Sequence, residues 1–394
     1  MKTYVIGAGV GDEELMTIKA RFIINSADIV LTTKRLFDEL SHLSSNIISM
    51  SIDEIISQIN SYRNTEKNIA VIASGDVCFY SIANTIKNKC PGIQLEYING
   101  LSSLQYLCSK LLTSYDDAKL ISIHGREKSI VPFVTYNKKV FSLTGGKYKA
   151  HDLISDLIKH NLTDVQVSVG ENLSSPTERI IKGTPDVLKD LNFADLSVML
   201  IENTSPAYTT KHIKDEDFIR GKSPMSKECV RTVSISKLDI KPNDIVFDIG
   251  SGTGSVTIEM AKKANESIVY AIEKQDYAIE LIHQNIKKHK IYNITTVNDI
   301  APDGLLNLPI PDKVFIGGST GNLDKILEVI YSKNSETKIV INAVTIETLS
   351  EAVALFKNLN KDVEVSCLNV SESTKLGNYN LMKALNPVYI ICTI

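Results

Sequence analysis

The stretch FDIGSGTGS (residues 247–255) decides the fold of the second half of this 394-residue chain. It starts within the apolar run Ile245–Ile249 and leads into a segment of helical character. Glycines after a strand let the backbone turn sharply and approach a ligand, and a helix start offers free N–H groups. The residues expected to contact a ligand here are Asp248, Gly250, Ser251, Gly252, Thr253 and Gly254.

An acidic residue after the next strand narrows the class of ligand. Glu273 directly follows the apolar run Ile268–Ile272, and a carboxylate at that place can accept hydrogen bonds from the two hydroxyls of a ribose. The glycine spacing is GxGxG with an acid two positions ahead, whereas the dinucleotide fingerprint is GxGxxG. We therefore predict a nucleoside site that favours S-adenosylmethionine, with NAD as the alternative.

The runs around this loop are dense in Ile and Val, as expected of parallel strands covered on both faces. Between them, residues such as Leu323, Ile326, Leu327 and Ile330 repeat at helical spacing and give one apolar stripe. Five strand–helix units followed by two terminal strands predict a seven-stranded Rossmann-type sheet. The expected strands are Ile245–Ile249, Ile268–Ile272, Thr295–Val297, Val314–Ile316, Ile339–Ile341, Val363–Val370 and Val388–Thr393.

The first half also alternates short apolar runs with helical segments, which predicts a second α/β domain. A polar stretch with two prolines, at about Asn203–Ser226, is expected to be the linker. The predicted domains are therefore residues 1–205 and 206–394. The expected strands of the first half are Tyr4–Ala8, Ile29–Thr32, Ile69–Ala73, Leu95–Ile98, Leu120–Ile123, Val140–Leu143, Val165–Val169 and Val198–Ile201.

Several strands of the first half end in glycine or small polar residues, at the edge where open α/β sheets bind ligands. The first glycine loop does not fit a dinucleotide site. Asp12 stands where GxGxxG needs a glycine, and the next strand ends in threonines instead of an acidic residue. The expected ligand contacts are Gly7, Gly9, Gly11, Ser74, Gly75, Asp76, Ser102, Ser103 and Gly145.

Composition excludes other classes of protein. The apolar fraction of 43% and the net charge of −3 are those of a soluble globular chain without a basic nucleic-acid surface. The six cysteines and seven histidines show no metal-ligand spacing. No apolar run approaches the ~20 residues of a membrane span, and residues 1–10 do not resemble a signal peptide. We expect a cytoplasmic protein without metal, nucleic-acid or membrane partners.

Residues from about Asp215 onward resemble the cobalamin-pathway C15 methyltransferases that also decarboxylate the ring C12 acetate. The matching stretches are DEDFIRGKSPMSKECVR, FDIGSGTGSVTIEMA, VYAIEKQDYAIELIHQN, VFIGGSTGNLDKIL, INAVTIETL and ALNPVYII. The resemblance implies that Ser226 touches the cofactor and that Ala301 meets the adenine through its backbone. The family usually has Gly-Asp-Ala-Pro, whereas Ile300 precedes Ala301 here. A motif similar to an NPPY box, beginning at Asn386, is interpreted as a turn before the last strand.

Residues 1–200 resemble the tetrapyrrole methylase family, specifically its ring-C5 member. The resemblance lies in four loops that follow strands (residues 74–76, 100–105, 124–126 and 144–146) and in ENLSSPTERIIKGT (residues 171–184). The resemblance implies two α/β lobes with the cofactor in the cleft between them. Val10 and Val77 replace the usual loop prolines, and Thr32 and Thr33 replace a Gly-Gly pair. Because proline fixes the backbone, these loops are expected to be less preorganised.

The two resemblances in this order are typical of the family of decarboxylating C5,15-methyltransferases that act on precorrin-6Y or its cobalt form. They imply S-adenosylmethionine as cofactor, one per domain, a polycarboxylate tetrapyrrole as substrate, and a homo-oligomer. Carboxylates need cationic or amide donors. The candidates for substrate binding are Lys34, Arg35, Arg126, Arg231 and Asn342. Because methyl transfer itself needs no strong base, the sequence does not indicate a catalytic side chain.

Alternatives from other classes remain. Another S-adenosylmethionine-dependent methyltransferase, acting on nucleic acid or a small molecule, would share the fold of the second half. A two-domain NAD oxidoreductase would need GxGxxG in the first half, where it fails. A third alternative is a ligand-binding module without catalysis. An assay of methyl transfer from S-adenosylmethionine to a corrinoid precursor separates such a module from an enzyme.

Overall fold

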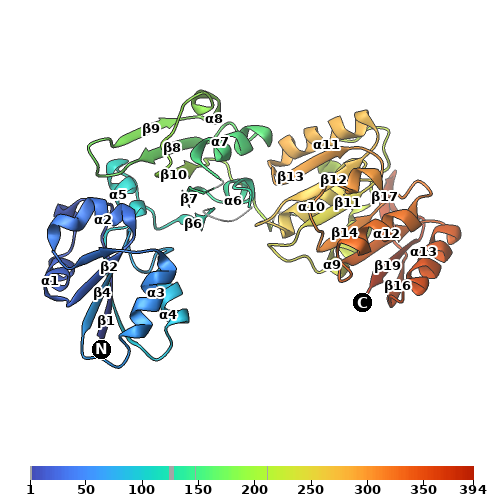
Figure 1. Ribbon diagram of the computed structural model, residues 1–394. Coiled ribbons are helices and arrows are strands. Elements are labelled where there is room, and N and C mark those ends of the chain that lie inside the picture. The colour runs from blue at the N-terminus through green and yellow to red at the C-terminus, as the bar shows by residue number, and fades with distance from the viewer. Residues whose placement is uncertain (1, 124–127, 147, 211) are drawn as a thin grey trace. The chain divides into compact units, whose positions relative to one another are not determined.

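The computed structural model describes all residues except 1, 124–127, 147 and 211. Its backbone contacts divide the chain into two compact units, each considered by itself. The first unit comprises residues 1–127, 139–154 and 165–202. The second unit comprises residues 128–138, 155–164 and 203–394. Figure 1 labels the elements of both units.

The first unit begins with an all-parallel five-stranded sheet in the order β3-β2-β4-β1-β5. Helices α1 and α2 lie on one face of this sheet, and α3 and α4 lie on the other (Figure 1). The buried Ile, Leu and Ala side chains of these helices pack against the sheet. The elements are β1 Lys2–Gly7, α1 Ile18–Ser26, β2 Ile29–Thr32, α2 Lys34–Leu40, β3 Ile47–Ser49, α3 Ile52–Ser61, β4 Asn68–Ala73, α4 Ala83–Lys89 and β5 Gln94–Ile98.

A second, mixed sheet of the first unit has the order β6-β7-β10-β8-β9, in which only β6 and β7 run parallel. Leu104, Leu107 and Cys108 of α5 pack against Phe141 and Leu200 of this sheet. The elements are α5 Ser103–Lys110, β6 Ala118–Ser122, β7 Lys139–Leu143, α7 Ala150–Lys159, β8 Gln166–Glu171, β9 Arg179–Gly183, α8 Pro185–Leu188 and β10 Ser197–Glu202.

The second unit contains a seven-stranded sheet in the order β13-β12-β11-β14-β15-β19-β16, which confirms the predicted Rossmann-type fold. The first five strands are parallel, and β19 runs antiparallel to β15 and β16. Helices α9, α10 and α11 cover one face, and α12 and α13 cover the other. The elements are α6 Val131–Tyr136, α9 Glu228–Leu238, β11 Val246–Ile249, α10 Ser255–Lys263, β12 Val269–Glu273, α11 Asp276–His289, β13 Ile294–Asn298, β14 Lys313–Ile316, α12 Leu323–Lys333, β15 Lys338–Ala343, α13 Ile346–Asn358, β16 Val363–Leu368 and β19 Val388–Thr393.

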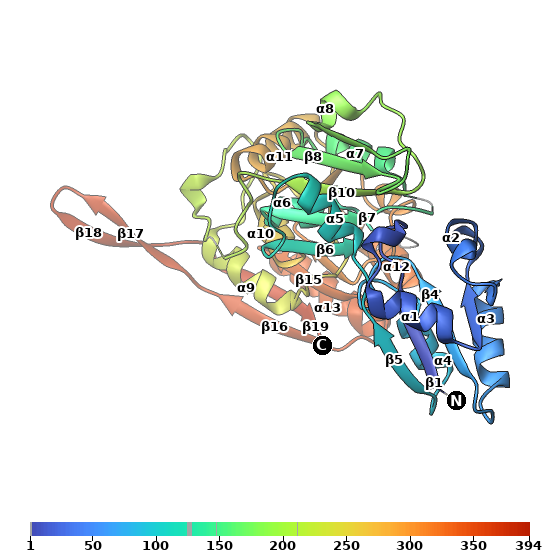
Figure 2. The same cartoon turned by 90° about the vertical axis from the view of Figure 1, so that its left-hand side faces the viewer.

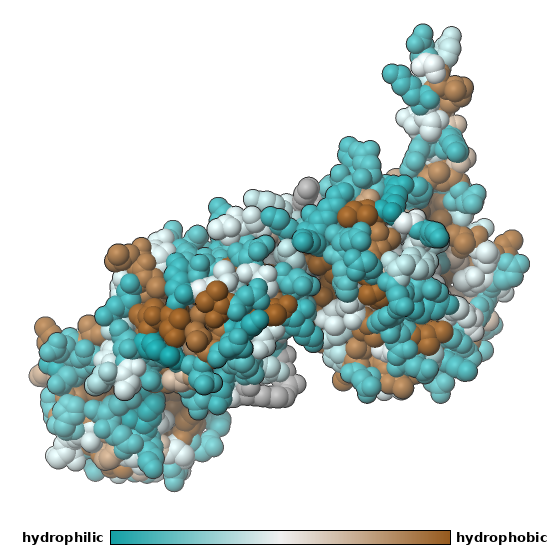
Figure 3. All heavy atoms as spheres, turned by 90° about the horizontal axis from the view of Figure 1, so that it is seen from above, coloured by the Kyte–Doolittle hydropathy of each residue, from teal (hydrophilic) through white to brown (hydrophobic). Residues whose placement is uncertain are grey.

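A hairpin between β16 and β19 is absent from the sequence prediction. Its strands, β17 Ser371–Leu376 and β18 Tyr379–Ala384, pair only with each other and are exposed along their whole length. It projects from the sheet as an arm that carries apolar and polar side chains (Figures 2 and 3). Polar residues dominate its first strand, so no buried strand pattern marked it.

Other differences from the sequence prediction are small. The short strands β3 and β9 were not predicted. Helix α1 begins at Ile18, because the Thr17 hydroxyl accepts a hydrogen bond from the Ala20 N–H and caps the helix there. Among the described helices, none is both long enough and apolar enough to span a membrane.

Candidate functional site

A cavity of about 710 Å³ opens in the second unit at the carboxyl ends of its parallel strands. Residues following β11, β12, β13, β14 and β15 all contribute to its wall. Of the residues predicted from the sequence, the cavity is lined by Ser226, Asp248, Gly250, Ser251, Gly252, Thr253, Glu273, Ala301 and Asn342. One loop and several strand ends therefore meet where parallel α/β sheets hold ligands.

The glycine loop requires its glycines for conformation and for space. Gly250, Gly252 and Gly254 have φ values of +75°, +55° and +75°, which L side chains rarely adopt. A Cβ on Gly250 would lie 2.8 Å from the carbonyl oxygen of Gly318, so the two loops touch through their backbones. Gly254 does not line the cavity. Instead it is the N-cap residue of α10, which places the free N–H groups of that helix beside the cavity.

Glu273 fixes the loop from the neighbouring strand. Its Oε2 accepts a hydrogen bond of 3.0 Å from the Gly252 N–H, and its Oε1 accepts one of 3.0 Å from Gln275 N–H. A carboxylate has about four acceptor positions. Two remain for ribose hydroxyls, so the side chain can hold the loop and a nucleoside together.

Asp248 is fully buried beneath the loop. Its Oδ2 accepts a hydrogen bond from the Thr257 hydroxyl, while Oδ1 has no hydrogen-bond partner. Burial, together with the nearby Glu273 charge and against the opposing effect of the Thr257 hydrogen bond, raises the pKa of this carboxyl to about 7.

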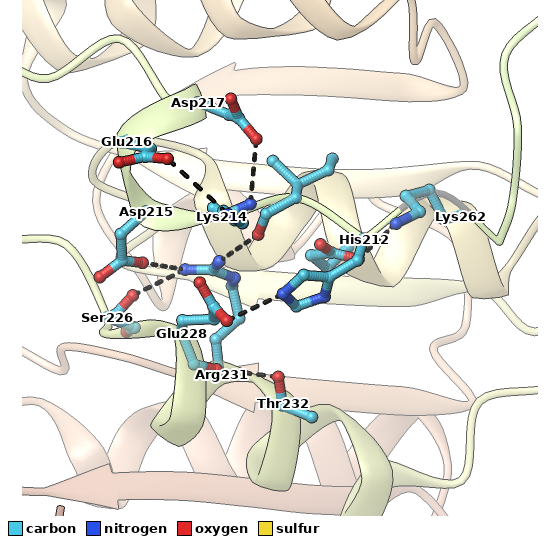
Figure 4. A network of polar contacts seen from close by, with 12 residues as sticks. His212, Lys214, Asp215, Glu216, Asp217, Ser226, Glu228, Arg231, Thr232 and Lys262 are labelled. Carbon is cyan, nitrogen blue, oxygen red and sulfur yellow. Dashed lines mark hydrogen bonds and ion pairs between the residues drawn. The ribbon is translucent and has the colours of Figure 1, made fainter. Parts of the chain in front are cut away.

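Arg231 does not line the cavity, and the structure gives it a role different from the predicted contact with substrate carboxylates. The side chain is only 2% exposed. Its guanidinium donates to Asp215 Oδ1 at 3.0 Å, and to the carbonyls of Ser226 and Ile213 at 2.9 Å each (Figure 4). The guanidinium also lies 4.9 Å from the centre of the Phe218 ring. Arg231 thereby fixes the backbone of Ser226, which lines the cavity.

Asn342 and Ala301 mark opposite sides of the cavity. The Asn342 side-chain amide lies 2.9 Å from the Ser234 hydroxyl, which is also within hydrogen-bond distance, at 2.8 Å, of the Val230 carbonyl. Ala301, 7% exposed, follows β13, and its carbonyl accepts a hydrogen bond of 3.4 Å from Asn322. Both residues stay within reach of a ligand in the cavity.

Sequence reasoning missed several cavity residues. Gly317 and Gly318 follow β14, and the Gly-Gly pair after a strand was the signal that could have identified them. Asn386, in the turn interpreted as purely structural, also lines the cavity. Its position in the chain, just before the last strand, concealed this, because β19 is inserted beside β15.

In the first unit, three predicted loops meet at the carboxyl ends of β1, β4 and β5. A Cβ on Gly100 would lie 2.5 Å from the carbonyl oxygens of both Gly7 and Gly75, so three backbones touch at one point. Gly9 and Gly75 exchange hydrogen bonds of 3.2 and 2.7 Å. These contacts require glycine and leave backbone groups at the surface of the sheet edge.

The Asp76 side chain holds two of these loops together through hydrogen bonds. Its Oδ2 accepts from Gly100 N–H at 3.2 Å, and its Oδ1 accepts from Cys78 N–H at 2.8 Å. Gly11 belongs to the same region, where the Ser174 hydroxyl donates to the Val10 carbonyl at 3.0 Å. The ENLSSPTERI segment therefore contacts the first glycine loop.

The other predicted residues of the first unit differ in whether their polar groups already form hydrogen bonds within the protein. Ser102 caps α5 in a reciprocal box with Gln105, so its hydroxyl is occupied, and Ser103 begins the helix. Ser74 is exposed beside Gly75. Gly145 follows β7 of the other sheet and forms a bridge with Tyr148.

The predicted cations of the first unit lie on the first turn of α2. Lys34 is exposed, and Arg35 pairs with Glu39 at 3.0 Å. Arg126 lies outside the described residues.

Comparison with known proteins gives two family matches, one in each half of the sequence. Residues 2–188 match the family described as tetrapyrrole (corrin/porphyrin) methylases, and residues 217–393 match the precorrin methyltransferase domain. A probable cobalt-precorrin-6B C(15)-methyltransferase (decarboxylating) of Pyrobaculum calidifontis is 37% identical over 187 residues, which are 47% of this chain and 96% of that protein. The chain belongs to the family of decarboxylating precorrin methyltransferases. The counterpart in Methanocaldococcus jannaschii is 37% identical over 180 residues, 45% of this chain and 96% of the relative.

The chain is also similar to parts of solved structures. A precorrin-6Y C5,15-methyltransferase from Geobacter metallireducens shares 38% identity, with a TM-score of 0.45, over 46% of this chain and 95% of that chain. A precorrin-6Y methylase from Archaeoglobus fulgidus shares 19% identity, with a TM-score of 0.41, over 52% of this chain and 98% of that chain.

Proposed function

We propose that this chain transfers methyl groups from S-adenosylmethionine to C5 and C15 of a corrin precursor and removes the C12 acetate carboxyl as CO₂, within cobalamin biosynthesis. The substrate is precorrin-6Y or its cobalt form. The observation that carries the proposal is the presence, in one chain, of a tetrapyrrole methylase match and a precorrin methyltransferase match. We assign C5 methylation to the first unit, and C15 methylation with decarboxylation to the second.

The cavity residues fit S-adenosylmethionine, which combines a ribose with a positively charged sulfur. Glu273 can accept from the ribose hydroxyls, and the backbone beside Ala301 can meet the adenine. We propose one such site in each unit, the first at the meeting point of Gly7, Gly75 and Gly100.

When bound, S-adenosylmethionine supplies an electrophilic methyl group. The chain contributes position: holding donor and acceptor carbon in line can lower the barrier by about 7–11 kcal/mol. Apolar lining residues such as Val230, Phe315 and Val344 exclude water, which favours a step in which the charge on sulfur disappears. In the decarboxylation, the bond from the acetate methylene to its carboxyl breaks, the electron pair enters the conjugated ring, and a proton then adds to the methylene.

The chain's products test this assignment. Incubation of the purified protein with S-adenosylmethionine and precorrin-6Y should give a product that is heavier by two CH₂ units, because each methyl group replaces a proton, and lighter by one CO₂ in the mass spectrum. The cobalt form, tested in parallel, identifies the preferred substrate. If neither precorrin-6Y nor its cobalt form were methylated under conditions in which the protein binds S-adenosylmethionine, the proposal would be contradicted.

We further propose that the enzyme works in the cytoplasm as a homo-oligomer, without nucleic-acid or membrane partners. The hairpin β17–β18 supports self-association, because Leu376, Tyr379 and Met382 are 65, 76 and 67% exposed on it. Sedimentation should give a mass above 43.5 kDa. A monomeric wild type would contradict the oligomer, and serine at the three positions should shift an oligomer toward the monomer.

A further inference from the structure

One wall of the cavity in the second unit is a segment of irregular backbone. Residues 213–227, which we call the strap, contain the 3₁₀ helix Asp215–Asp217 and lead into α9. Five consecutive strap residues line the cavity: Ser223, Pro224, Met225, Ser226 and Lys227. The strap also touches the glycine loop, since a Cβ on Gly252 would lie 3.2 Å from the Pro224 carbonyl oxygen. The position of the strap relative to this loop therefore sets the shape of the cavity.

Backbone outside helices and sheets needs other hydrogen-bond partners, and Arg231 supplies some of them to the strap. Its guanidinium joins the two ends of the strap by donating to the carbonyls of Ile213 and Ser226 (Figure 4). Because Arg231 belongs to α9, into which the strap leads, these bonds fix the strap to its own continuation. They do not link it to the glycine loop.

Asn285 of α11 supplies that link. Its side chain is 0% exposed, and its Oδ1 accepts a hydrogen bond of 2.7 Å from the Ile219 N–H. Its Nδ2 donates to the Ile219 carbonyl and to the Thr253 carbonyl, at 3.0 Å each. Ile219 belongs to the strap, and Thr253 belongs to the glycine loop. Both N–H groups of the amide are therefore used, one for each wall of the cavity.

Apolar packing holds the strap in the core but gives it less precise direction. Ile213 and Phe218 are 2% and 4% exposed and bury one side of the strap. Apolar burial is non-directional, whereas hydrogen bonds restrict both distance and angle. The three bonds of Asn285 therefore set how the strap lies against the glycine loop.

We propose that Asn285 is a positioning residue for the cofactor of the second unit, because it holds two walls of the cavity in a fixed relation. The proposal rests on the proposed function, in which this cavity binds S-adenosylmethionine. Asn285 is not one of the described residues that line the cavity, so it acts through the backbone of Ile219 and Thr253. Without it, the cofactor has to order the strap when it binds, and this ordering lowers the affinity.

The test is Asn285→Ala in the full chain, with both methylations followed by mass spectrometry over a range of S-adenosylmethionine concentrations. The KM for S-adenosylmethionine in C15 methylation should rise about tenfold or more, because the hydrogen bonds between the two walls are lost. The KM in C5 methylation should stay within about twofold of wild type, because that reaction is assigned to the first unit.

Asn293→Ala is the matched control for a purely structural loss. Asn293 is also 0% exposed, and its Nδ2 donates to the carbonyls of Ala261, Ala264 and Ser267 at 2.9, 3.0 and 3.0 Å. These three residues lie outside the cavity lining. Asn293→Ala should lower the free energy of unfolding, as Asn285→Ala does, but leave both KM values within about twofold of wild type.

If Asn285→Ala does not fold, Ile219→Pro decides the question. Proline removes the N–H that donates to Asn285, and Phe218 already has φ −86° and ψ 141°, the extended conformation that a following proline requires. The KM for S-adenosylmethionine in C15 methylation should then rise roughly three- to tenfold.

An unchanged KM in the folded variant, or an equal rise in Asn293→Ala, would overturn the inference. Failure of the wild type to methylate C15 of any corrin precursor would instead overturn the proposed function.

Discussion

The two units differ in how the proposed ligand site is formed at the edge of a parallel sheet. In the second unit, one continuous glycine loop forms part of the cavity wall, and Glu273 holds this loop by accepting a hydrogen bond from the Gly252 N–H at 3.0 Å. In the first unit, three loops far apart in the sequence meet, and a Cβ on Gly100 would lie 2.5 Å from two carbonyl oxygens. A side-chain change in the second unit should therefore affect ligand binding first. A glycine change in the first unit should affect the fold first.

The largest effect is expected from Gly100→Ala. The added methyl group would collide with backbone rather than with a movable side chain, so we expect a loss of about 3 kcal/mol or more in the unfolding free energy of the first unit. Denaturant unfolding measures it. Gly221→Ala, whose Cβ would meet only a Leu281 methyl at 3.4 Å, is the control and should change stability by less than about 0.5 kcal/mol. If Gly100→Ala and Gly221→Ala had the same free energy of unfolding, the expectation that a glycine change in the first unit affects the fold first would be wrong.

A pH-dependent effect is expected from Asp248. Its carboxyl keeps its proton in the folded chain up to a pKa of about 7, whereas the unfolded chain loses it near the ordinary value of 3.8. Between these values the folded state binds more protons, so the unfolding free energy falls as pH rises. From pH 5 to pH 8, wild type should lose about 2–3 kcal/mol relative to Asp248→Asn. Parallel stability curves for the two proteins would show that this carboxyl does not titrate in this range.

Glu273→Gln should weaken cofactor binding in the second unit by about ten- to a hundredfold, because a charge-assisted contact with ribose is lost. Formation of the C15-methylated, decarboxylated product should fall, while C5 methylation persists at saturating substrate. Calorimetry and mass spectrometry measure the two effects. Glu328→Gln, exposed on α12, should behave as wild type. An equal loss of both methylations would contradict the assignment of one reaction to each unit.

The smallest effect is expected from Ser234→Ala. Removing the hydroxyl that orients Asn342 should raise the KM for the tetrapyrrole roughly three- to tenfold, the value of one neutral hydrogen bond. The KM for S-adenosylmethionine should not change, because Ser234 lies outside the cavity lining. A change confined to the cofactor KM would indicate that α9 supports the nucleoside side instead.

The second unit was more readily predicted from the sequence than the first, for physical reasons. Its strands are rich in Ile and Val and its loop is one contiguous motif, so local patterns predicted the fold and the glycine loop of the cavity wall. The contact between Gly7, Gly75 and Gly100 joins three distant segments, and the sequence indicated the glycines but not their approach. The burial of Arg231 was not predicted, because charge alone does not reveal burial. Asn386 was missed because only the antiparallel insertion of β19 beside β15 brings it to the cavity.

The central claim is that one chain holds two separate sites for the same cofactor. Calorimetric titration with S-adenosylhomocysteine tests it most directly, applied to wild type and to Gly252→Arg. Gly252 has a φ of +55° and a Cβ there would lie 3.2 Å from the Pro224 carbonyl, so arginine should close only the second site. We predict two molecules bound per wild-type chain and one per variant chain. One molecule per wild-type chain, or two per Gly252→Arg chain, would contradict the account.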